Sequence, residues 1–168
     1  MNGLGRLLFR ARGAIGAAAA VAVVALGRPT GGSVQWGLPV ILAGLALRFW
    51  AMGHIGAAAR SFRIGAQARV TSGPYRLLRH PLYLGNALIV AGMLVAFRAP
   101  PGLAAAVAAG FVVAYGLMAR AEERQLAGLP EARPGFEFVR ALADWWAVLA
   151  CVLMLGVALA RIAFRACG

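Results

Sequence analysis

The sequence predicts an all-α integral membrane protein with about five transmembrane helices. Hydrophobic residues make up 62% of the 168 residues and the mean hydropathy is +0.79, which is more apolar surface than one soluble core of this size can bury. The net charge is +12, and the basic residues, all arginines, lie between apolar segments instead of clustering on one polar domain. Membrane topology produces this alternation, so the basic charge does not indicate nucleic-acid binding.

Five apolar segments are the predicted helices. They cover residues 14–26, 34–52, 82–97, 103–119 and 145–160. The first follows three arginines as a signal peptide would, but four further segments favour an anchor. The second carries Arg48 near its end, where we expect the side chain to reach the membrane interface. The short break at 98–102 predicts that the third and fourth helices form an antiparallel hairpin.

The placement of the arginines predicts the orientation in the membrane. With a cytoplasmic N-terminus, thirteen of the 17 basic residues fall on the cytoplasmic side. The polar stretches 53–80 and 120–140 then emerge together on that face, and the helical hairpin connects them. We interpret the chain as a single membrane domain, 1–168. Its parts are two N-terminal membrane segments (1–52), a core bearing the motifs described below (53–126) and a C-terminal part with the last helix (127–168).

A polar cluster is expected where the hairpin brings its two ends together. His80 and Tyr83 lie three residues apart at the start of the third segment, hence on one helix face, and Glu122-Glu123 follow the fourth. Carboxylates at the edge of a bilayer are costly without partners. An alternative is that these acids only balance neighbouring arginines and that His80 only caps its helix or faces lipid headgroups. The two cysteines and two histidines have no metal-ligand spacing, so we expect no metal.

These residues resemble a known family. Residues 73–85 read Gly-Pro-Tyr-Arg-Leu-Leu-Arg-His-Pro-Leu-Tyr-Leu-Gly, and residues 120–126 read Arg-Ala-Glu-Glu-Arg-Gln-Leu. Two such motifs, joined by a hairpin, resemble the isoprenylcysteine carboxyl methyltransferase and phospholipid methyltransferase family. The resemblance covers about residues 67 to 126. It implies a helical membrane enzyme that uses S-adenosyl-L-methionine to methylate a lipid or a lipid-attached group at the cytoplasmic face.

The resemblance also implies site residues. The positions it assigns to the cofactor are Gln67, Ala68, Arg69, Val70, Tyr75, His80, Pro81, Leu82, Tyr83 and Glu122, with Glu123 as the alternate for the last. Arg120 is the nearest arginine for a substrate-facing role. Glu123 is the candidate base if the acceptor is an amine, because an ammonium must lose its proton before it attacks. After the acidic pair the family usually continues with Phe-Gly and two spaced tyrosines, whereas this chain has Leu129-Pro130, Pro134-Gly135, Phe136 and Phe138. We therefore expect closure over the cofactor to differ.

Three hypotheses about function follow. The first is methyl transfer to a membrane lipid or lipidated acceptor, either a carboxylate or an amine, in the inner membrane of a bacterium. The second is a nicotinamide-dependent lipid reductase, and the third is a non-catalytic membrane scaffold. The expected partners are the bilayer and its lipids, and no nucleic acid or metal. The sequence predicts no particular oligomeric state. Four glycines would permit close helix packing within or between chains: Gly85, Gly92, Gly110 and Gly116.

Overall fold

The computed structural model describes residues 3–55 and 68–167 and is almost entirely helical. The α-helices are α1 (Gly3–Leu26), α2 (Gly31–Ile55), α3 (Pro81–Ala96), α4 (Pro101–Leu126), α5 (Phe138–Leu142) and α6 (Trp145–Cys167). Three of these, α2, α4 and α6, are long and apolar enough to cross a membrane, while α3 and the Gly13–Leu26 part of α1 are shorter apolar helices. The predicted all-α integral membrane protein is thereby confirmed.

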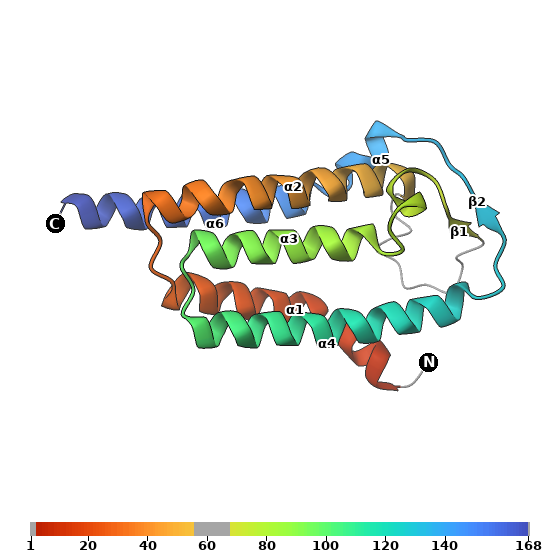
Figure 1. Cartoon of the computed structure of the whole chain (residues 1–168), viewed down its shortest axis with the longest axis horizontal. Coiled ribbons are helices and arrows are strands. Elements are labelled where there is room, and N and C mark those ends of the chain that lie inside the picture. The colour runs from red at the N-terminus through yellow and green to blue at the C-terminus, as the bar shows by residue number, and fades with distance from the viewer. Residues whose placement is uncertain (1–2, 56–67, 168) are drawn as a thin grey trace.

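The helices lie side by side and alternate in direction, so the polar segments gather at one end (Figure 1). At this end α1 begins and α4 ends, whereas the α1–α2 and α3–α4 connections lie at the opposite end. Two short strands, β1 (Arg69–Val70) and β2 (Glu131–Ala132), pair there in parallel, with Arg69 opposite Glu131. The sequence did not predict this small sheet. The sheet joins the two polar stretches that were expected to meet.

Glycines bring α2 and α3 into close contact. A Cβ on Gly37 would lie 2.5 Å from the carbonyl oxygen of Gly92, and one on Gly44 would lie 2.7 Å from the carbonyl oxygen of Gly85. These two pairs repeat seven residues apart on each helix, and small residues at such positions let two membrane helices approach closely. Of the four glycines expected to support packing, Gly85 and Gly92 therefore face α2. The other two, Gly110 and Gly116 on α4, have open space where a Cβ would lie, with no neighbouring atom within 4 Å among the described residues.

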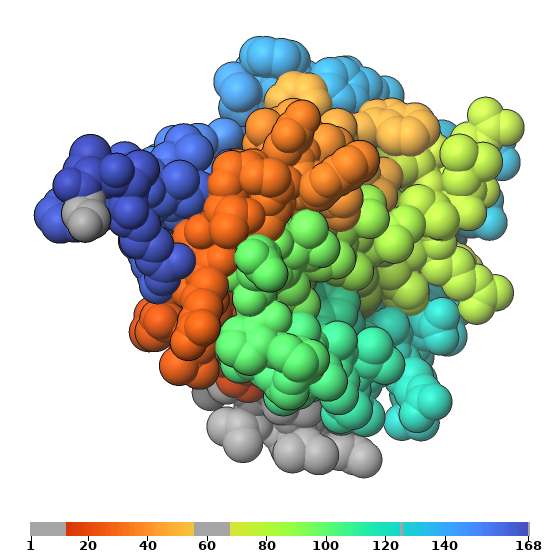
Figure 2. Space-filling model, turned by 60° about the vertical axis from the view of Figure 1, so that its left-hand side comes forward, coloured from red at the N-terminus to blue at the C-terminus, as the bar shows by residue number. Residues whose placement is uncertain are grey.

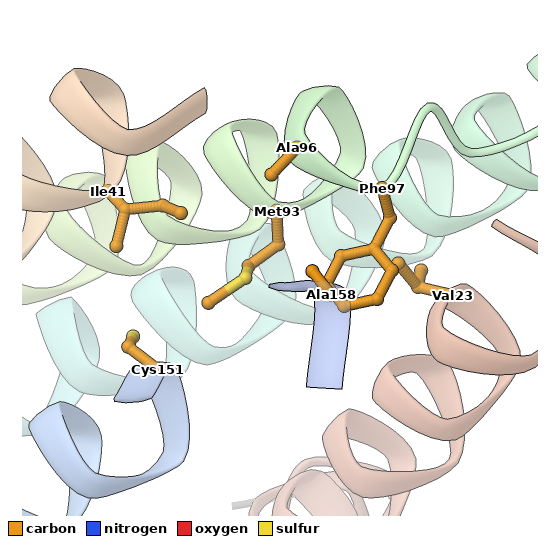
Figure 3. Close-up of a cluster of buried hydrophobic side chains, with 7 residues drawn as sticks. All are labelled: Val23, Ile41, Met93, Ala96, Phe97, Cys151 and Ala158. Atoms are coloured by element: carbon orange, nitrogen blue, oxygen red, sulfur yellow. The ribbon is translucent and has the colours of Figure 1, made fainter. Parts of the chain in front are cut away.

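The buried apolar core lies where α1, α2, α3 and α6 meet. It consists of Val23, Ile41, Met93, Ala96, Phe97, Cys151 and Ala158 (Figure 3). Figure 2 shows α2 lying between α3 and α6, with the end of α6 projecting from this face. Large apolar side chains elsewhere point outward, such as Val112, which is 70% exposed, and Leu153, which is 61% exposed. In a membrane such residues contact lipid, so their exposure costs nothing.

Helix α4 is longer than the sequence predicted, and this changes where the acidic pair lies. We expected the helix to end at residue 119 with Glu122-Glu123 beyond it, but α4 continues to Leu126. Residues 119–126 are mostly Ala, Arg, Glu and Gln, which favour helix even where the chain is no longer apolar. The helix ends before Gly128, whose φ is +83°. Glu122 and Glu123 are thus held rigidly in the last turns of α4.

Candidate active site

The first element of the site is the start of α3. Pro81 occupies the first turn of the helix, where its missing N–H removes no helical hydrogen bond, and its side chain is fully buried. His80 precedes it with φ −132° and ψ 67°, and its carbonyl oxygen accepts hydrogen bonds from the backbone N–H groups of Tyr83 and Leu84. His80 and Tyr83 therefore lie on the same face of the first turn. Their rings stack, with centroids 5.2 Å apart and planes 12° apart.

The second element is the end of α4, which brings Glu122 against this stacked pair. The Tyr83 hydroxyl donates a 2.8 Å hydrogen bond to Oε2 of Glu122. Nδ1 of His80 lies 3.5 Å from the same oxygen, and Nε2 lies 3.5 Å from Oε1 of Glu123. Glu123 also forms an exposed 3.4 Å ion pair with Arg79. The structure brings the groups of the predicted cluster together: an imidazole, a phenol and two carboxylates meet between α3 and α4.

The acidic neighbours favour the protonated form of His80. Its pKa is raised above the ordinary value of 6.5, chiefly by the interaction with Glu122. Partial burial of the ring opposes this shift, and Glu123 adds to it. His80 and the Glu122 carboxylate thus hold each other in place where α3 begins and α4 ends.

This shift predicts a pH-dependent contribution to stability. Because the pKa of His80 is higher in the folded than in the unfolded state, protonation contributes stability that is complete below about pH 6.5 and lost as the pH rises through the raised value. Thermal unfolding of wild type and His80→Gln in detergent between pH 5.5 and 9 measures it. We expect the difference in melting temperature to be constant at the acidic end and to shrink above it. A difference that grows with pH would contradict the assignment.

A third element carries Tyr75, on the 3-10 helix η2 (Gly73–Arg76). Its hydroxyl is buried, and burial first, then the charge of Glu122, raises its pKa well above the ordinary range. This buried hydroxyl has no hydrogen-bond partner among the described residues, and Nε2 of His80, which is also buried, has only the 3.5 Å contact with Oε1 of Glu123. Buried polar atoms are rarely left unsatisfied, so each such atom needs an explanation. The Tyr75 hydroxyl and Nε2 of His80, both near Glu122, are therefore suited to bind a polar ligand.

The turn before η2 is fixed by α2 and by the segment after α4. Gly73 has φ +57° and lies against the ring of His54 on α2, which is 8% exposed. The Ser72 hydroxyl donates a 2.6 Å hydrogen bond to the carbonyl oxygen of Pro134. Phe136 stacks edge-on against His54, with centroids 5.7 Å apart. The aromatic residue that departs from the family pattern therefore packs against the end of α2.

The remaining predicted residues are less closely placed. Ala68, Arg69 and Val70 lie in or next to β1, at the same end of the molecule, and Leu82 lies in the first turn of α3 beside His80. Gln67 lies outside the described residues. Arg120 is exposed on α4 and stands two positions from Glu122, so the two side chains point about 200° apart around the helix. The structure does not bring Arg120 into the cluster, and its substrate role stays a prediction.

Sequence reasoning missed a polar group directly beneath the cluster. Arg48 was expected to reach the membrane interface, but its side chain is 15% exposed and turns inward. It bonds to Asp144, just before α6, and to Asn86 on α3, which in turn donates a hydrogen bond to the hydroxyl of Tyr115 on α4. A charged residue within an apolar segment is the signal that pointed to Arg48. Nothing in the sequence indicated Asp144 as its partner.

The fold and the cluster define a class: a helical membrane protein with a charged, partly buried site at one end of its bundle. A family model for phospholipid methyltransferases matches residues 33–129, more than half of the chain. The chain belongs to this family, and it is an S-adenosyl-L-methionine-dependent membrane methyltransferase. Comparison with curated proteins and with solved structures finds no match. The family match thus favours the first of the three hypotheses about function.

Proposed function

We propose that the enzyme methylates the amine of a phospholipid headgroup, with the cofactor held by the cluster at the ends of α3 and α4. The observation that carries this proposal is the contact of Glu122 with both Tyr83 and His80, beside the buried Tyr75 hydroxyl, which has no hydrogen-bond partner among the described residues. The family description supports a phospholipid as the acceptor. The acidic character of the cluster supports an amine over a carboxylate, because two carboxylates would repel an anionic acceptor.

The residues of the cluster fit the cofactor by chemistry. S-Adenosyl-L-methionine supplies an activated methyl group on a positively charged sulfur. Glu122 is suited to hold positive charge, and the hydrogen bond from Tyr83 orients its carboxylate. The buried hydroxyl of Tyr75 and Nε2 of His80 are suited to hydrogen-bond polar groups of the cofactor. The backbone of residues 68–70 and the first turn of α3, including Pro81 and Leu82, complete the proposed cofactor site.

The acceptor amine must lose a proton before it attacks, and Glu123 is the proposed base. Glu123 is 46% exposed, so it is the carboxylate of the pair that the acceptor reaches more easily. One methyl group then moves from sulfur to nitrogen, and the amine proton passes to Glu123 and on to water. Alignment of the reacting atoms contributes most of the rate, which for well-oriented groups amounts to about 7–11 kcal/mol.

Methyl transfer to defined lipids tests this proposal. The purified protein is reconstituted in phosphatidylglycerol vesicles that contain either phosphatidylethanolamine or oleic acid, and radiolabelled S-adenosyl-L-methionine is added. We expect label in a base-stable lipid product only with phosphatidylethanolamine. Base-labile label from oleic acid would instead identify a carboxylate acceptor. Absence of label from both lipids, in a protein that binds S-adenosylhomocysteine, would reject both acceptors.

We further propose that all five apolar helices span the membrane and that the site faces the cytoplasm. The arginine distribution supports this orientation, and so does the position of the α1 start at the same end as the site. At about 24 Å, α3 is shorter than the bilayer core and needs local thinning. Cys167, exposed at the far end of α6, provides the test. A membrane-impermeant maleimide should label it from outside intact cells, but not in Cys167→Ser, and labelling only after lysis would reverse the orientation.

A further inference from the structure

An ion pair lies within the bundle beneath the proposed cofactor site. Arg48 on α2 donates two hydrogen bonds to Asp144, from Nε to Oδ2 at 2.9 Å and from Nη2 to Oδ1 at 2.6 Å. The two side chains are only 15% and 11% exposed. Burying two charges is costly, and such pairs add little net stability compared with apolar residues. The bidentate geometry fixes the guanidinium plane and thereby the direction in which Nη1 of Arg48 points.

The third side of the guanidinium orients Asn86 on α3. Arg48 Nη1 donates to Oδ1 of Asn86, and Nδ2 of Asn86 donates a 2.9 Å hydrogen bond to the hydroxyl of Tyr115 on α4. Because arginine is a donor only, the amide oxygen must face it and the NH₂ group must face the tyrosine. The ion pair therefore decides which way the amide points. It also decides that the Tyr115 hydroxyl accepts a hydrogen bond in this contact.

Tyr115 leads to the site. Its ring packs edge-on against Tyr83, with centroids 4.9 Å apart and planes 79° apart, and Tyr83 donates its hydroxyl hydrogen to Glu122. We call the contacts from Arg48 through Asn86, Tyr115 and Tyr83 to Glu122 the relay. The residue spacing on both helices supports it. Tyr115 and Glu122 are seven residues apart and so lie on the same face of α4, as Tyr83 and Asn86 do on α3. Each link of this chain is a direct contact between neighbouring helices.

Two further observations show that Arg48 packs against the first family motif, whereas its partner Asp144 lies outside the residues that the family model matches. A Cβ on Gly85, the last residue of the first motif, would lie 2.6 Å from Cγ of Arg48, so the glycine leaves the room that the arginine stem occupies. Asp144, by contrast, follows the residues 33–129 that the family model matches. The carboxylate that neutralises Arg48 thus comes from the C-terminal part of the chain.

We propose that Arg48 and Asp144 are positioning residues for the methyl-transfer site, acting through Asn86 and Tyr115 to set the orientation of Tyr83 and Glu122. Neither contacts the substrate or the cofactor in this role. The C-terminal segment thereby contributes to cofactor affinity without lining the site. This inference rests on the proposed location of the cofactor at Glu122.

The test uses variants that remove single contacts between the ion pair and the site. Asn86→Leu leaves Arg48 and Asp144 paired but removes the amide, while Asp144→Asn removes the charge and Asp144→Glu is the conservative rescue. Glu137→Gln, which breaks the exposed 2.7 Å ion pair with Arg140, is the matched control. Each variant is titrated with S-adenosylhomocysteine by calorimetry in detergent, and its melting temperature is recorded separately. We expect Asn86→Leu to weaken binding about tenfold while the protein stays folded, and the control to bind as wild type does.

A double-mutant cycle distinguishes positioning from stability. If Asn86 acts through Tyr83, the loss of affinity caused by Asn86→Leu should largely disappear in a Tyr83→Phe background. In that background the hydrogen bond from Tyr83 to Glu122, which Asn86 helps to position, is already absent. Additive losses, or a lowered melting temperature with unchanged affinity in Asn86→Leu, would overturn the inference. Should Asp144→Asn fail to fold, the cycle still tests the link from Asn86 to Tyr83, and Asp144→Glu, which shifts the carboxylate, tests the contribution of the ion pair. Failure of wild type to bind S-adenosylhomocysteine would instead count against the proposed function itself.

Discussion

Replacing Glu122 by glutamine is expected to weaken S-adenosylhomocysteine binding by about 10- to 100-fold and to reduce methyl transfer at least as much. The substitution keeps the shape of the side chain but removes the charge to which the Tyr83 hydroxyl donates at 2.8 Å and beside which His80 Nδ1 lies at 3.5 Å. A hydrogen bond to a charged group contributes about 1.5–3 kcal/mol, which corresponds to the expected loss. Affinity for S-adenosyl-L-methionine should fall further, since its sulfonium adds a positive charge.

Calorimetric titration of the detergent-purified variant measures this effect. The neighbouring acid provides the comparison, as the variant Glu123→Gln. Glu123 is 46% exposed and lies 3.5 Å from Nε2 of His80. We expect it to keep most of the cofactor affinity but to lose turnover, as a base for the acceptor would. Glu131→Gln, on β2 and 61% exposed, controls for the loss of one acid. If Glu123→Gln lost binding and Glu122→Gln did not, the roles of the two carboxylates would be exchanged.

The parts of the fold that the sequence predicted are those set by apolar length and by motif spacing. The hairpin follows from two apolar runs separated by Arg98-Ala-Pro-Pro-Gly, and a short connection leaves an antiparallel pair as the natural arrangement. Once that pair is assumed, His80 must lie near Glu122, and the structure brings the two together. The predicted end of α4 was about two turns too early. Hydropathy marks where the apolar segment ends, whereas the residues that follow still favour helix as far as Leu126.

The contacts that the sequence did not predict are long-range polar ones. Arg48 was visible as a charge in an apolar segment, but its partner is 96 residues away. No local pattern selects Asp144 from the five acids of the chain. The pairing of β1 with β2 was missed for the same reason, because each strand has only two residues and so carries no alternating pattern. Such contacts depend on how the helices dock, which periodicity alone does not determine.

Substituting Gly73 by alanine is expected to have the largest effect on stability, about 2–5 kcal/mol. Two separate costs add at this residue. Its φ of +57° is unfavourable by about 1–2 kcal/mol for a residue with a Cβ. That Cβ would also lie 2.4 Å from Cε1 of His54, and overpacking of this kind costs about 1–3 kcal/mol. Because Tyr75 follows two residues later, binding of S-adenosylhomocysteine should weaken as well.

Gly128 separates the two costs, because it has φ +83° but no described atom within 4 Å of where a Cβ would lie. Gly128→Ala should therefore show the conformational cost alone, about 1–2 kcal/mol, without loss of ligand affinity. In a His54→Ala background, Gly73→Ala should lose its overlap and cost no more than Gly128→Ala. Denaturation in mixed detergent micelles measures all four variants. Equal destabilisation by Gly73→Ala and Gly128→Ala in the wild-type background would mean that the ring of His54 moves aside freely, and that α2 does not hold the turn that carries Tyr75.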